Sequence, residues 1–530
     1  MAVFLRNTGN GVCVRLTKVW NRAICRTDLI VCHQRHTYSS SPQIQSQLKT
    51  TAKKVSIPTR NLGQPTPYTH PHLMKYGDVT PGIGAAEFVQ RRTKLMSEIG
   101  KLSASEKGKK HIVVVPSHPK MYMTDEIPYP FRQSTDFLYL CGFQEPDSIL
   151  ILESLPDRHL PAHKATLLVP KRDAHRELWD GPRSGTQGAT DFIGVDVAYE
   201  NGGLAEFLEQ LSQHNNIVLW YDFLKPTHPE FHNKIMKQLI LPVRNAGNAI
   251  KTLEETLHRM RVIKSPAEQE LMRQSASIAS HAFINVMKFS TPLINESDIY
   301  ARIDYECRIH GAEFLAYPPV VAGGNRANIL HYVNNNQIVK PDELILMDAG
   351  CEYHGYASDI TRTWPVSGKF TPPQRTLYEV VLDVQMKCLE MCSLPNITLD
   401  QIYNSMLKML GCHLQDLGIL SRQLDEMDTL KHASKYCPHH VGHYLGMDTH
   451  DTPRVPRSVN LQPGMVITVE PGVYIPLSDT NAPSEYRGIG IRIEDDVLIT
   501  KDGTAEILTS QCPKQVKDIE NLFSGTMFPW

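Results

Sequence analysis

Residues 343–364, ELILMDAGCEYHGYASDITRTW, restrict the possible folds more than any other stretch of the chain. An apolar run leads into Asp348, and turn-prone residues around Tyr353 and His354 lead back to Asp359, which predicts a β-hairpin. A turn centred on Tyr353 and His354 places the two aspartates opposite each other, with Cα atoms about 4.5 to 5.5 Å apart. Because carboxylates this close repel, the hairpin predicts a cation between them. The alternative is a hairpin whose acidic residues simply face water.

Further candidate ligands lie nearer the C-terminus. They are His443 in PHHVGHYLGMDTHD (438–451), Glu470 in VITVEPGVYI (466–475) and Glu494 in GIGIRIEDDVLI (488–499). Each glutamate ends an alternating or β-branched apolar run, so each carboxylate is predicted to lie on a buried strand. A buried carboxylate without a partner is costly, and a cation is the commonest remedy. These motifs therefore strengthen the prediction of a metal site.

Four motifs, MDAGCEYHGYASDITRT, HHVGHYLGMDTHD, VEPGVY and GIGIRIEDD, follow one another in the order and spacing found in one family. With them the sequence resembles the aminopeptidase P metallopeptidases of the pita-bread fold, over roughly residues 65 to 510. The resemblance implies an α/β amino-terminal domain plus an α+β pita-bread catalytic domain. In that family these motifs supply five ligands to a pair of divalent metal ions, which correspond here to Asp348, Asp359, His443, Glu470 and Glu494.

Four carboxylates and one imidazole make an oxygen-rich site that suits Mn²⁺, with Co²⁺ or Zn²⁺ as alternatives. By the resemblance, Asp359 and Glu494 bridge the two ions, Asp348 completes one of them, and His443 with Glu470 completes the other. A hydroxide shared by the ions attacks the scissile carbonyl in such sites. Glu470 is expected to exchange the proton that the bridging water loses when this hydroxide forms.

Three histidines near the ligand motifs, His331, His439 and His450, are candidate catalytic residues. Taken alone, each is more often a structural histidine than a catalytic one. The resemblance implies the opposite, because histidines at these positions in the family polarise the carbonyl, stabilise the tetrahedral intermediate or relay protons. His440 has no counterpart with a function and is expected to be structural.

Arg492 and Tyr474 are expected to support the site. Arg492 lies two residues before Glu494 on the same face of a predicted strand, where it could donate to a metal-binding carboxylate. A surface ion pair is the alternative for this arginine. Tyr474 follows Glu470 by four residues and is expected to line the site.

The resemblance implies an aminopeptidase that releases the first residue of peptides with proline in the second position. Proline lacks an amide hydrogen and has a fixed φ, so general peptidases handle such bonds poorly. Prolidase, a dipeptidase of the same fold, is the nearest alternative. Binding proteins of this fold that have lost the metal are a second one, which retention of all five ligands disfavours. Methionine aminopeptidases usually lack the large amino-terminal domain, and creatinase lacks this ligand set.

The first 77 residues hold eleven Lys and Arg residues but a single acid, Asp28. This composition, with no uninterrupted apolar core, predicts a mitochondrial transit peptide over residues 1–40, followed by a linker over 41–64. The expected location is mitochondrial, with a cytoplasmic pool if a second translation start skips the presequence. A disordered basic tail on a cytosolic enzyme is the alternative.

The rest of the chain predicts two domains: an aminopeptidase P amino-terminal domain over 65–250 and a catalytic domain over 251–515, with a tail over 516–530. The amino-terminal domain is predicted from a helix near 85–102 and strands at 111–117, 147–153, 164–170 and 216–222. Capping boxes at Ser265, Thr371 and Thr398 predict helices near 265–289, 372–392 and 399–417, and a further helix is predicted near 296–310.

Composition limits the partners of the chain. A net charge of −1 argues against nucleic-acid binding through bulk positive charge, and no apolar stretch approaches the 18 or so residues that a membrane span requires. The 11 cysteines include no CxxC pair and are expected to be reduced thiols. A homodimer is expected by the resemblance alone.

Overall fold

The computed structural model describes residues 58–524, apart from residues 107, 156–157, 213–215 and 246–247. All of these described residues belong to one compact unit. The transit peptide predicted for residues 1–40, and residues 41–57 of the predicted linker, lie outside the described residues. No helix within the described ranges is long and apolar enough to cross a membrane.

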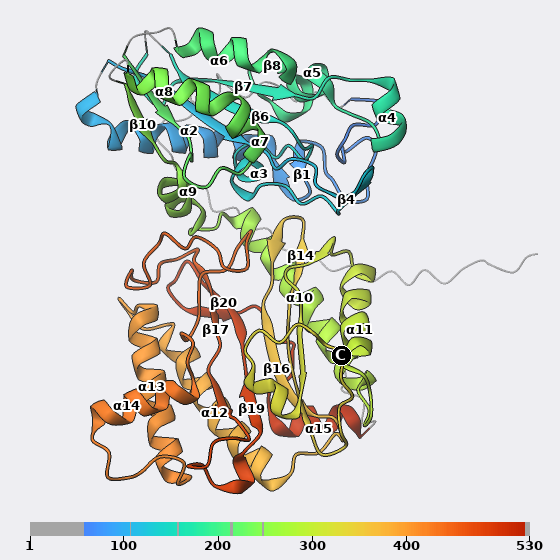
Figure 1. The fold of residues 1–530 in the computed structure, drawn as a ribbon, viewed down its shortest axis with the longest axis vertical. Helices are drawn as coiled ribbons and strands as arrows, with labels where there is room; N and C mark the ends of the chain where they lie inside the picture. Colours follow the sequence, from blue (N-terminus) through green and yellow to red (C-terminus); the bar gives the residue numbers. More distant parts are fainter. Residues whose placement is uncertain (1–57, 107, 156–157, 213–215, 246–247, 525–530) are drawn as a thin grey trace, which may run out of the picture. The chain divides into compact units, whose positions relative to one another are not determined.

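The amino-terminal part is built on a six-stranded mixed sheet in the order β10-β9-β3-β6-β7-β8 (Figure 1). Its helices and strands are β1 Asp78–Thr80, β2 Ile83–Gly84, α2 Ala85–Leu102, β3 Lys110–Pro116, β4 Tyr122–Thr124, β5 Ile127–Pro128, α3 Thr135–Cys141, β6 Ile149–Ser154, β7 His163–Val169, α4 Ala174–Asp180, α5 Gly185–Gly188, β8 Val197–Glu200, α6 Leu204–Ser212, β9 Ile217–Trp220, α7 Pro229–Phe231, α8 Lys237–Asn245, β10 Ala249–Lys251 and α9 Glu254–Arg261.

Strand β3 shows why this sheet needs helices on both faces. Ile112 and Val114 pack in the core that α6, α7 and α8 help to form, whereas Val113 and Val115 pack in the core that contains α2 and α3. Successive side chains of a strand point to opposite faces, so a continuous apolar run is buried only when both faces are covered. The predicted α/β domain is confirmed, and helix α2 has the predicted bounds.

The second part is an α+β domain, as predicted. Its elements are α10 Pro266–Phe289, α11 Glu296–Ile309, β11 Phe314–Leu315, β12 Val320–Gly323, β13 Leu344–Ala349, β14 Cys351–Tyr353, β15 Tyr356–Ala357, β16 Ile360–Pro365, α12 Pro372–Met391, α13 Leu399–Asp416, α14 Glu426–Tyr436, β17 Val466–Val469, β18 Gly472–Ile475, β19 Ile489–Arg492, β20 Asp495–Ile499, β21 Ala505–Ile507 and α15 Val516–Phe523.

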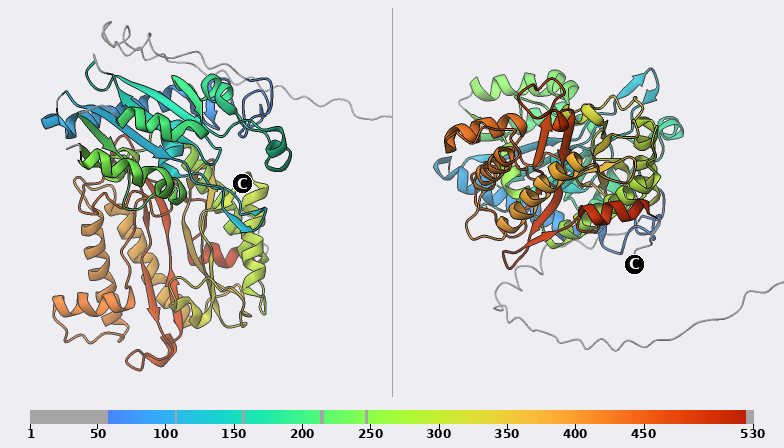
Figure 2. Two further views of the ribbon diagram at one scale, coloured as in Figure 1. Left: turned by 45° about the horizontal axis from the view of Figure 1, so that its top comes forward. Right: turned by 90° about the horizontal axis from the view of Figure 1, so that it is seen from below.

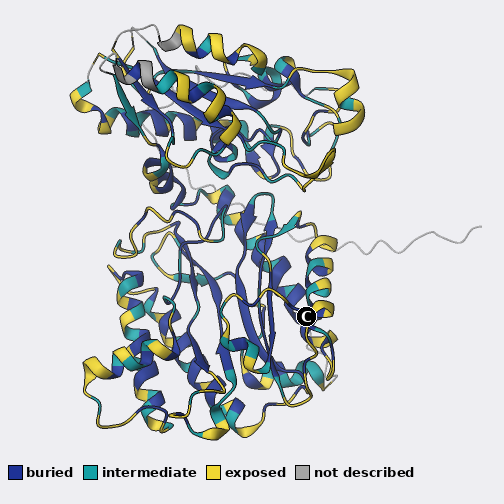
Figure 3. Cartoon of the chain, in the orientation of Figure 1, coloured by how far each residue is buried: buried dark blue, intermediate teal, exposed yellow. Residues whose placement is uncertain are grey.

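These elements form two similar sets, each with helices packed on antiparallel strands (Figure 2). In the first set, α10 packs against the strands β14, β15 and β16. In the second, α12 packs against β17, β18 and β19. The strands are buried, whereas the outer faces of the helices are exposed (Figure 3). One large core joins both sets, so the ligands of the predicted site come from a continuous scaffold.

The predicted helix starts are confirmed in detail. Ser265 and Glu268 form a reciprocal capping box with Pro266 at the first helical position of α10. Thr398 and Gln401 form a second reciprocal capping box, at the start of α13. These caps satisfy backbone N–H groups that have no partner inside the helix.

The predicted register of the aspartate hairpin is wrong by one position in the turn. The loop consists of His354 and Gly355, with φ of 51° and 84°, so Asp348 lies opposite Thr361 rather than opposite Asp359. Two-residue hairpin loops with positive φ at both positions match the twist of the flanking strands, and glycine adopts such a φ without strain. The glycine therefore fixes the turn one residue later than predicted.

Two segments outside the predicted domains contribute to the cores. Leu62 of the predicted linker is buried in the core of the amino-terminal part. The predicted tail contains α15, whose residues Val516 and Ile519 are buried in the core of the second part. The spacing of these apolar residues suits one face of a short helix.

Candidate metal centre

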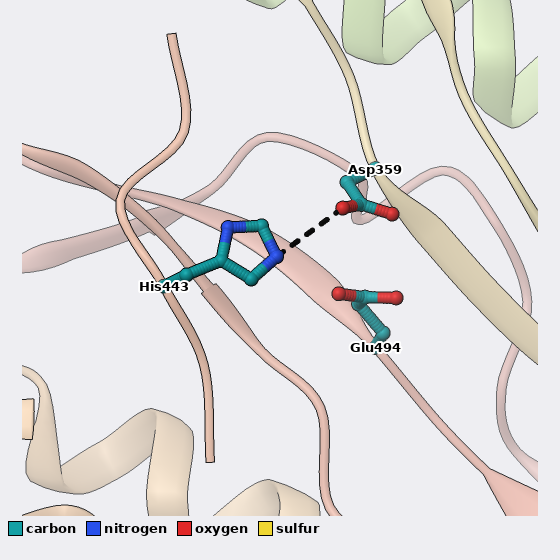
Figure 4. A group of neighbouring side chains, drawn as sticks. All are labelled: Asp359, His443 and Glu494. Carbon is teal, nitrogen blue, oxygen red and sulfur yellow. Dashed lines mark ion pairs between the residues drawn. The ribbon is translucent and has the colours of Figure 1, made fainter. Parts of the chain in front are cut away.

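Asp359, His443 and Glu494 come together in the second part of the chain (Figure 4). Each offers one ligand atom, and these atoms lie within 4.8 Å of one another. The Nε2 atom of His443 is 3.4 Å from Oδ2 of Asp359. The two carboxylates are buried, so the site is small, acidic and largely shielded from water.

Backbone hydrogen bonds fix the segments that carry these ligands. Asp359 lies between β15 and β16, and Glu494 lies between β19 and β20. The Glu494 amide donates to the carbonyl of Thr361 at 3.0 Å, which ties the second glutamate motif to the aspartate hairpin. The His443 amide donates to Oγ1 of Thr468 in β17 at 3.2 Å. The three ligands therefore belong to neighbouring strands or to a loop bound to one.

The imidazole of His443 is oriented for metal binding. Its Nδ1 atom lies 3.1 Å from the carbonyl oxygen of Tyr444, which can only accept, so Nδ1 carries a hydrogen. Nε2 then faces the carboxylates, and a hydrogen bond of this kind is the usual partner of a metal-binding histidine. Burial lowers the pKa of His443, but the carboxylates of Asp359 and Glu470 outweigh it and raise that pKa to about 9.

The electrostatics of the cluster fit a cation. Burial, together with the neighbouring carboxylates, raises the pKa of Asp359 and of Glu494. Burial also raises the pKa of Glu470 to about 7. Like charges held this close in a buried site favour either protons or a metal ion among them. Oxygen donors with one imidazole suit a moderately hard divalent ion.

Asp348 is connected to the cluster by hydrogen bonds of Tyr317, a residue that was not predicted from the sequence to belong to the site. The hydroxyl of Tyr317 lies 2.6 Å from Oδ1 of Asp348 and 2.5 Å from Oδ1 of Asp359. The two aspartates therefore meet as predicted, but through a shared hydroxyl rather than across a hairpin pair. Tyr317 lies outside the four motifs, so no spacing in the sequence marks it.

Arg492 connects several of these groups. It is buried, and its Nη2 donates to Oδ2 of Asp348 at 2.6 Å. Its Nε donates to Oγ1 of Thr361 at 3.0 Å, and that hydroxyl donates to Oε2 of Glu494 at 2.6 Å. Arg492 is therefore not a surface ion pair, and the carboxylate that it contacts directly is Asp348. Such outer contacts fix the orientation of metal-binding carboxylates.

Tyr474 and His439 extend this network. Arg492 Nη1 donates to the Tyr474 hydroxyl at 2.8 Å, and that hydroxyl lies 2.9 Å from Nε2 of His439. The Nδ1 atom of His439 lies 2.9 Å from the carbonyl oxygen of His440, so it carries the hydrogen and Nε2 accepts from Tyr474. Burial, then the charge of Arg492, lowers the pKa of His439 to about 4. His439 is therefore neutral, with both nitrogens engaged.

The other two candidate histidines are exposed. The ring of His450 packs edge-on against His443, with ring centroids 4.5 Å apart. Burial of its ring, then the charges of His443 and His331, lowers the pKa of His450. His331 lies in the segment between β12 and β13. His440 stacks on Tyr403, which agrees with the structural role expected for it.

Comparison with known families accounts for both parts of the chain. Residues 88–220 match the aminopeptidase P N-terminal domain, and residues 270–501 match metallopeptidase family M24. The chain is 51% identical over 495 residues to Xaa-Pro aminopeptidase 3 of Homo sapiens, covering 93% of this chain and 95% of that protein. It is 40% identical over 473 residues to the mitochondrial intermediate cleaving peptidase 55 of Arabidopsis thaliana, covering 88% of each chain.

Solved structures agree with this similarity. Aminopeptidase PepP of Pseudomonas aeruginosa has a TM-score of 0.75 and 34% identity, covering 83% of this chain and 98% of that one. Zn-substituted aminopeptidase P of E. coli in complex with product has a TM-score of 0.74 and 32% identity, covering 84% of this chain and 100% of that one.

Proposed function

This chain belongs to metallopeptidase family M24 and carries the N-terminal domain of aminopeptidase P, and we propose that it releases the first residue of peptides whose second residue is proline. It is a metal-dependent hydrolase. The observation that best supports the proposal is the meeting of Asp359, His443 and Glu494 inside the part that matches the metallopeptidases. A site of three clustered ligands, with further carboxylates beside it, is suited to metal-assisted hydrolysis.

We assign the divalent metal ions to the clustered carboxylates and imidazole, with Mn²⁺ as the proposed occupant and Co²⁺ or Zn²⁺ as substitutes. When bound, a pair of such ions supplies Lewis acidity and a strong nucleophile at neutral pH. The assigned ligands are neighbours that are buried or partly buried: Asp348, Asp359, His443, Glu470 and Glu494.

Glu470 is the proposed proton carrier. Its pKa of about 7 places it where a carboxyl group both accepts and returns a proton near neutral pH. In peptide hydrolysis it takes a proton from the attacking water and delivers it to the leaving nitrogen. His439 lies 3.6 Å from Glu470 and has both nitrogens engaged, so we assign it to orienting Tyr474 and Glu470 rather than to titration.

His331 and His450 are the proposed donors to the substrate. Both are exposed, unlike His439, and His450 packs on the ligand His443. A neutral imidazole donates a hydrogen bond to a peptide carbonyl and stabilises the oxyanion that forms there. Because the proline nitrogen lacks a hydrogen, selection at the second residue relies on the shape of its ring.

The test is hydrolysis of an Xaa-Pro-Xaa tripeptide with added Mn²⁺ by the chain beginning at residue 41. We expect release of the first residue, and its loss in Asp359→Asn and Glu494→Gln. Asp416→Asn and Glu379→Gln are the matched controls, because these acids are exposed on helices of the same domain. Cleavage of an Xaa-Pro dipeptide but not of the tripeptide would identify a prolidase. Absence of release with any divalent metal would refute the proposal.

The name of the Arabidopsis thaliana relative supports a second class of substrate, polypeptides left as intermediates by an earlier cleavage. Two peptides that differ only in having proline or alanine at the second position separate the two classes. Similar kcat/KM for both peptides would favour the processing role, and a strong preference for proline would favour the role proposed above.

We also propose that the protein is mitochondrial and forms a homodimer. The basic, acid-poor beginning of the sequence and the mitochondrial relative support the location. Amino-terminal sequencing of the mature protein should find a start after Arg35, and an intact Met1 or Ala2 would contradict it. Light scattering of the purified enzyme tests the dimer.

A further inference from the structure

Arg132 of the amino-terminal part contacts two separate segments of the catalytic part. Its Nε donates to Oε2 of Glu352, in strand β14, at 2.6 Å. Its Nη2 donates to the carbonyl oxygen of Met447 at 2.8 Å and to Oδ1 of Asp448 at 3.1 Å. One guanidinium therefore joins two stretches that lie far apart in the sequence.

Both of these stretches carry groups of the metal centre. Glu352 lies in the aspartate hairpin, between Asp348 and Asp359 in the sequence. Met447 and Asp448 lie in the loop between His443 and His450. The hairpin supplies two carboxylates to the site, and the loop runs between His443 and His450. The distance between the carboxylates of the hairpin and the imidazoles at the ends of the loop therefore depends on the contacts that join these two segments.

The carboxyl end of this contact is well buried. Glu352 is 7% exposed, and burial raises its pKa, while Arg132 opposes that rise. A buried carboxylate needs a partner, so the Glu352 contact is stronger than an ordinary surface pair. The guanidinium of arginine is planar and has five N–H donors, so it can bond Glu352 and the loop at the same time.

The loop is also held by α9 and by the turn that follows it. Arg261, at the end of α9, donates to Oδ2 of Asp448 at 2.8 Å and forms a buried ion pair with Asp451. Lys264 adds a contact of 3.1 Å to Asp451. The loop is therefore held at Asp448 and, just after it, at Asp451. The Ala357 amide donates to the carbonyl oxygen of Gly446 at 2.8 Å, which joins hairpin and loop through the backbone. Arg132 adds a side-chain connection between the same two segments.

We propose that Arg132 is a positioning residue. It helps to hold the aspartate hairpin and the loop between His443 and His450, here called the histidine loop, at the distance from each other that metal binding and hydrolysis require. The proposal rests on the function proposed above. The amino-terminal domain then helps to maintain the metal centre, although it supplies none of the assigned ligands.

Three variants test the proposal in the full chain: Arg132→Gln, Arg132→Lys and the control Arg172→Gln. Arg172 is an arginine of the same domain that bonds both carboxylate oxygens of Glu177 on the surface. In Arg132→Gln we expect kcat and Mn²⁺ affinity each to fall by about tenfold or more, as is common for outer contacts of a metal site. KM should change by less than about threefold, since no contact with substrate is lost.

Arg132→Lys should resemble Arg132→Gln, because a single ammonium group cannot bond Glu352 and the loop in the same way. Combining Arg132→Gln with Glu352→Gln should cost no more than Arg132→Gln alone, because both changes break one connection. Calorimetric titration of the metal-free protein with Mn²⁺ reports the affinity without any peptide. The readout therefore remains valid even if the proposed substrate is wrong.

Several outcomes would overturn the proposal. Unchanged kcat and metal affinity would do so, and so would full recovery in Arg132→Lys, which would indicate a general effect of charge. A rise in KM alone would make Arg132 a substrate-binding residue. Circular dichroism measures the fraction of unfolded protein. A fall in activity no larger than that fraction would show that Arg132 is only a structural contact.

Discussion

The hydroxyl of Tyr317 is shared by Asp348 and Asp359, so one side chain couples the two aspartates of the hairpin. We expect Tyr317→Phe to weaken Mn²⁺ binding by about tenfold, since outer hydrogen bonds orient metal-binding carboxylates. Calorimetric titration of the metal-free protein measures the change. Tyr305→Phe is the control, because Tyr305 is exposed on α11. Equal affinities in wild type and Tyr317→Phe would show that the hydroxyl is dispensable.

The stabilising effect of a second single residue, Asp448, is expected to depend on pH. Burial raises its pKa, but Arg261 and Arg132 outweigh burial and lower that pKa to about 2, against 3.8 for an ordinary aspartate. Its stabilising effect is therefore complete above about pH 4 and is lost as pH falls towards about 2. Melting temperatures of the wild type and Asp448→Asn should differ at pH 5, and the difference should shrink as pH falls from about 4 towards 2. A constant difference would contradict the assignment.

Single residues were predicted from the sequence where a motif marks them. The assigned ligands lie in four recognisable motifs, and the structure brings Asp359, His443 and Glu494 into one cluster. Tyr317 could not be predicted, because only the fold brings it to the aspartates. The partner of Arg492 could not be predicted either, since its side chain reaches across to Asp348 rather than to a ligand of its own strand.

Among the elements, strands β16 and β20 are joined by a buried ion pair. Arg362 Nη2 donates to Oδ1 of Asp495 at 2.7 Å, and both side chains are fully buried. Arg362→Met should lower the free energy of unfolding by about 3 to 5 kcal/mol, because it leaves a buried carboxylate with fewer partners. Urea denaturation measures the loss, with the exposed Arg375→Met as the control. A loss of less than about 1 kcal/mol, the size expected of a surface pair, would refute this prediction.

The turn of the aspartate hairpin gives a second prediction for an element. Gly355 has a φ of 84°, and a Cβ atom there would lie 3.3 Å from Leu138. Gly355→Ala should therefore destabilise the protein by about 1 to 2 kcal/mol. The melting temperature checks this, with Gly202→Ala as the control, because open space surrounds Gly202. An unchanged melting temperature would mean that the turn adopts another form.

The elements were predicted best where local chemistry decides them. The bounds of α10 and α13 follow from capping boxes whose partners are three residues apart. The hairpin register was missed by one position because the choice between neighbouring turn residues depends on backbone twist. Helix α15 was missed because it is short and is stabilised by burial against the core rather than by its own propensity.

At the scale of the whole molecule, the clustered carboxylates link metal binding to stability. Burial and mutual repulsion raise the pKa of Glu494 and of Asp359, so a cation relieves a cost that the folded state otherwise bears. Adding Mn²⁺ at 100 times its dissociation constant should stabilise the fold by about 2.7 kcal/mol, and a chelator should reverse it. Thermal melting measures both effects. Asp359→Asn should respond much less, and an equal response would place the ion elsewhere.

The assigned ligands are spread along the chain from Asp348 to Glu494, which makes the timing of metal uptake a property of the fold. The histidine loop and both glutamates follow the hairpin in the sequence, and metal sites rarely exist before folding. A chain that leaves a ribosome or an import channel amino terminus first has its aspartate hairpin available early. The set of assigned ligands is complete only when Glu494, the last of them in the sequence, has emerged. The protein is therefore expected to acquire its metal only at the end of synthesis or import, from the compartment in which it finishes folding.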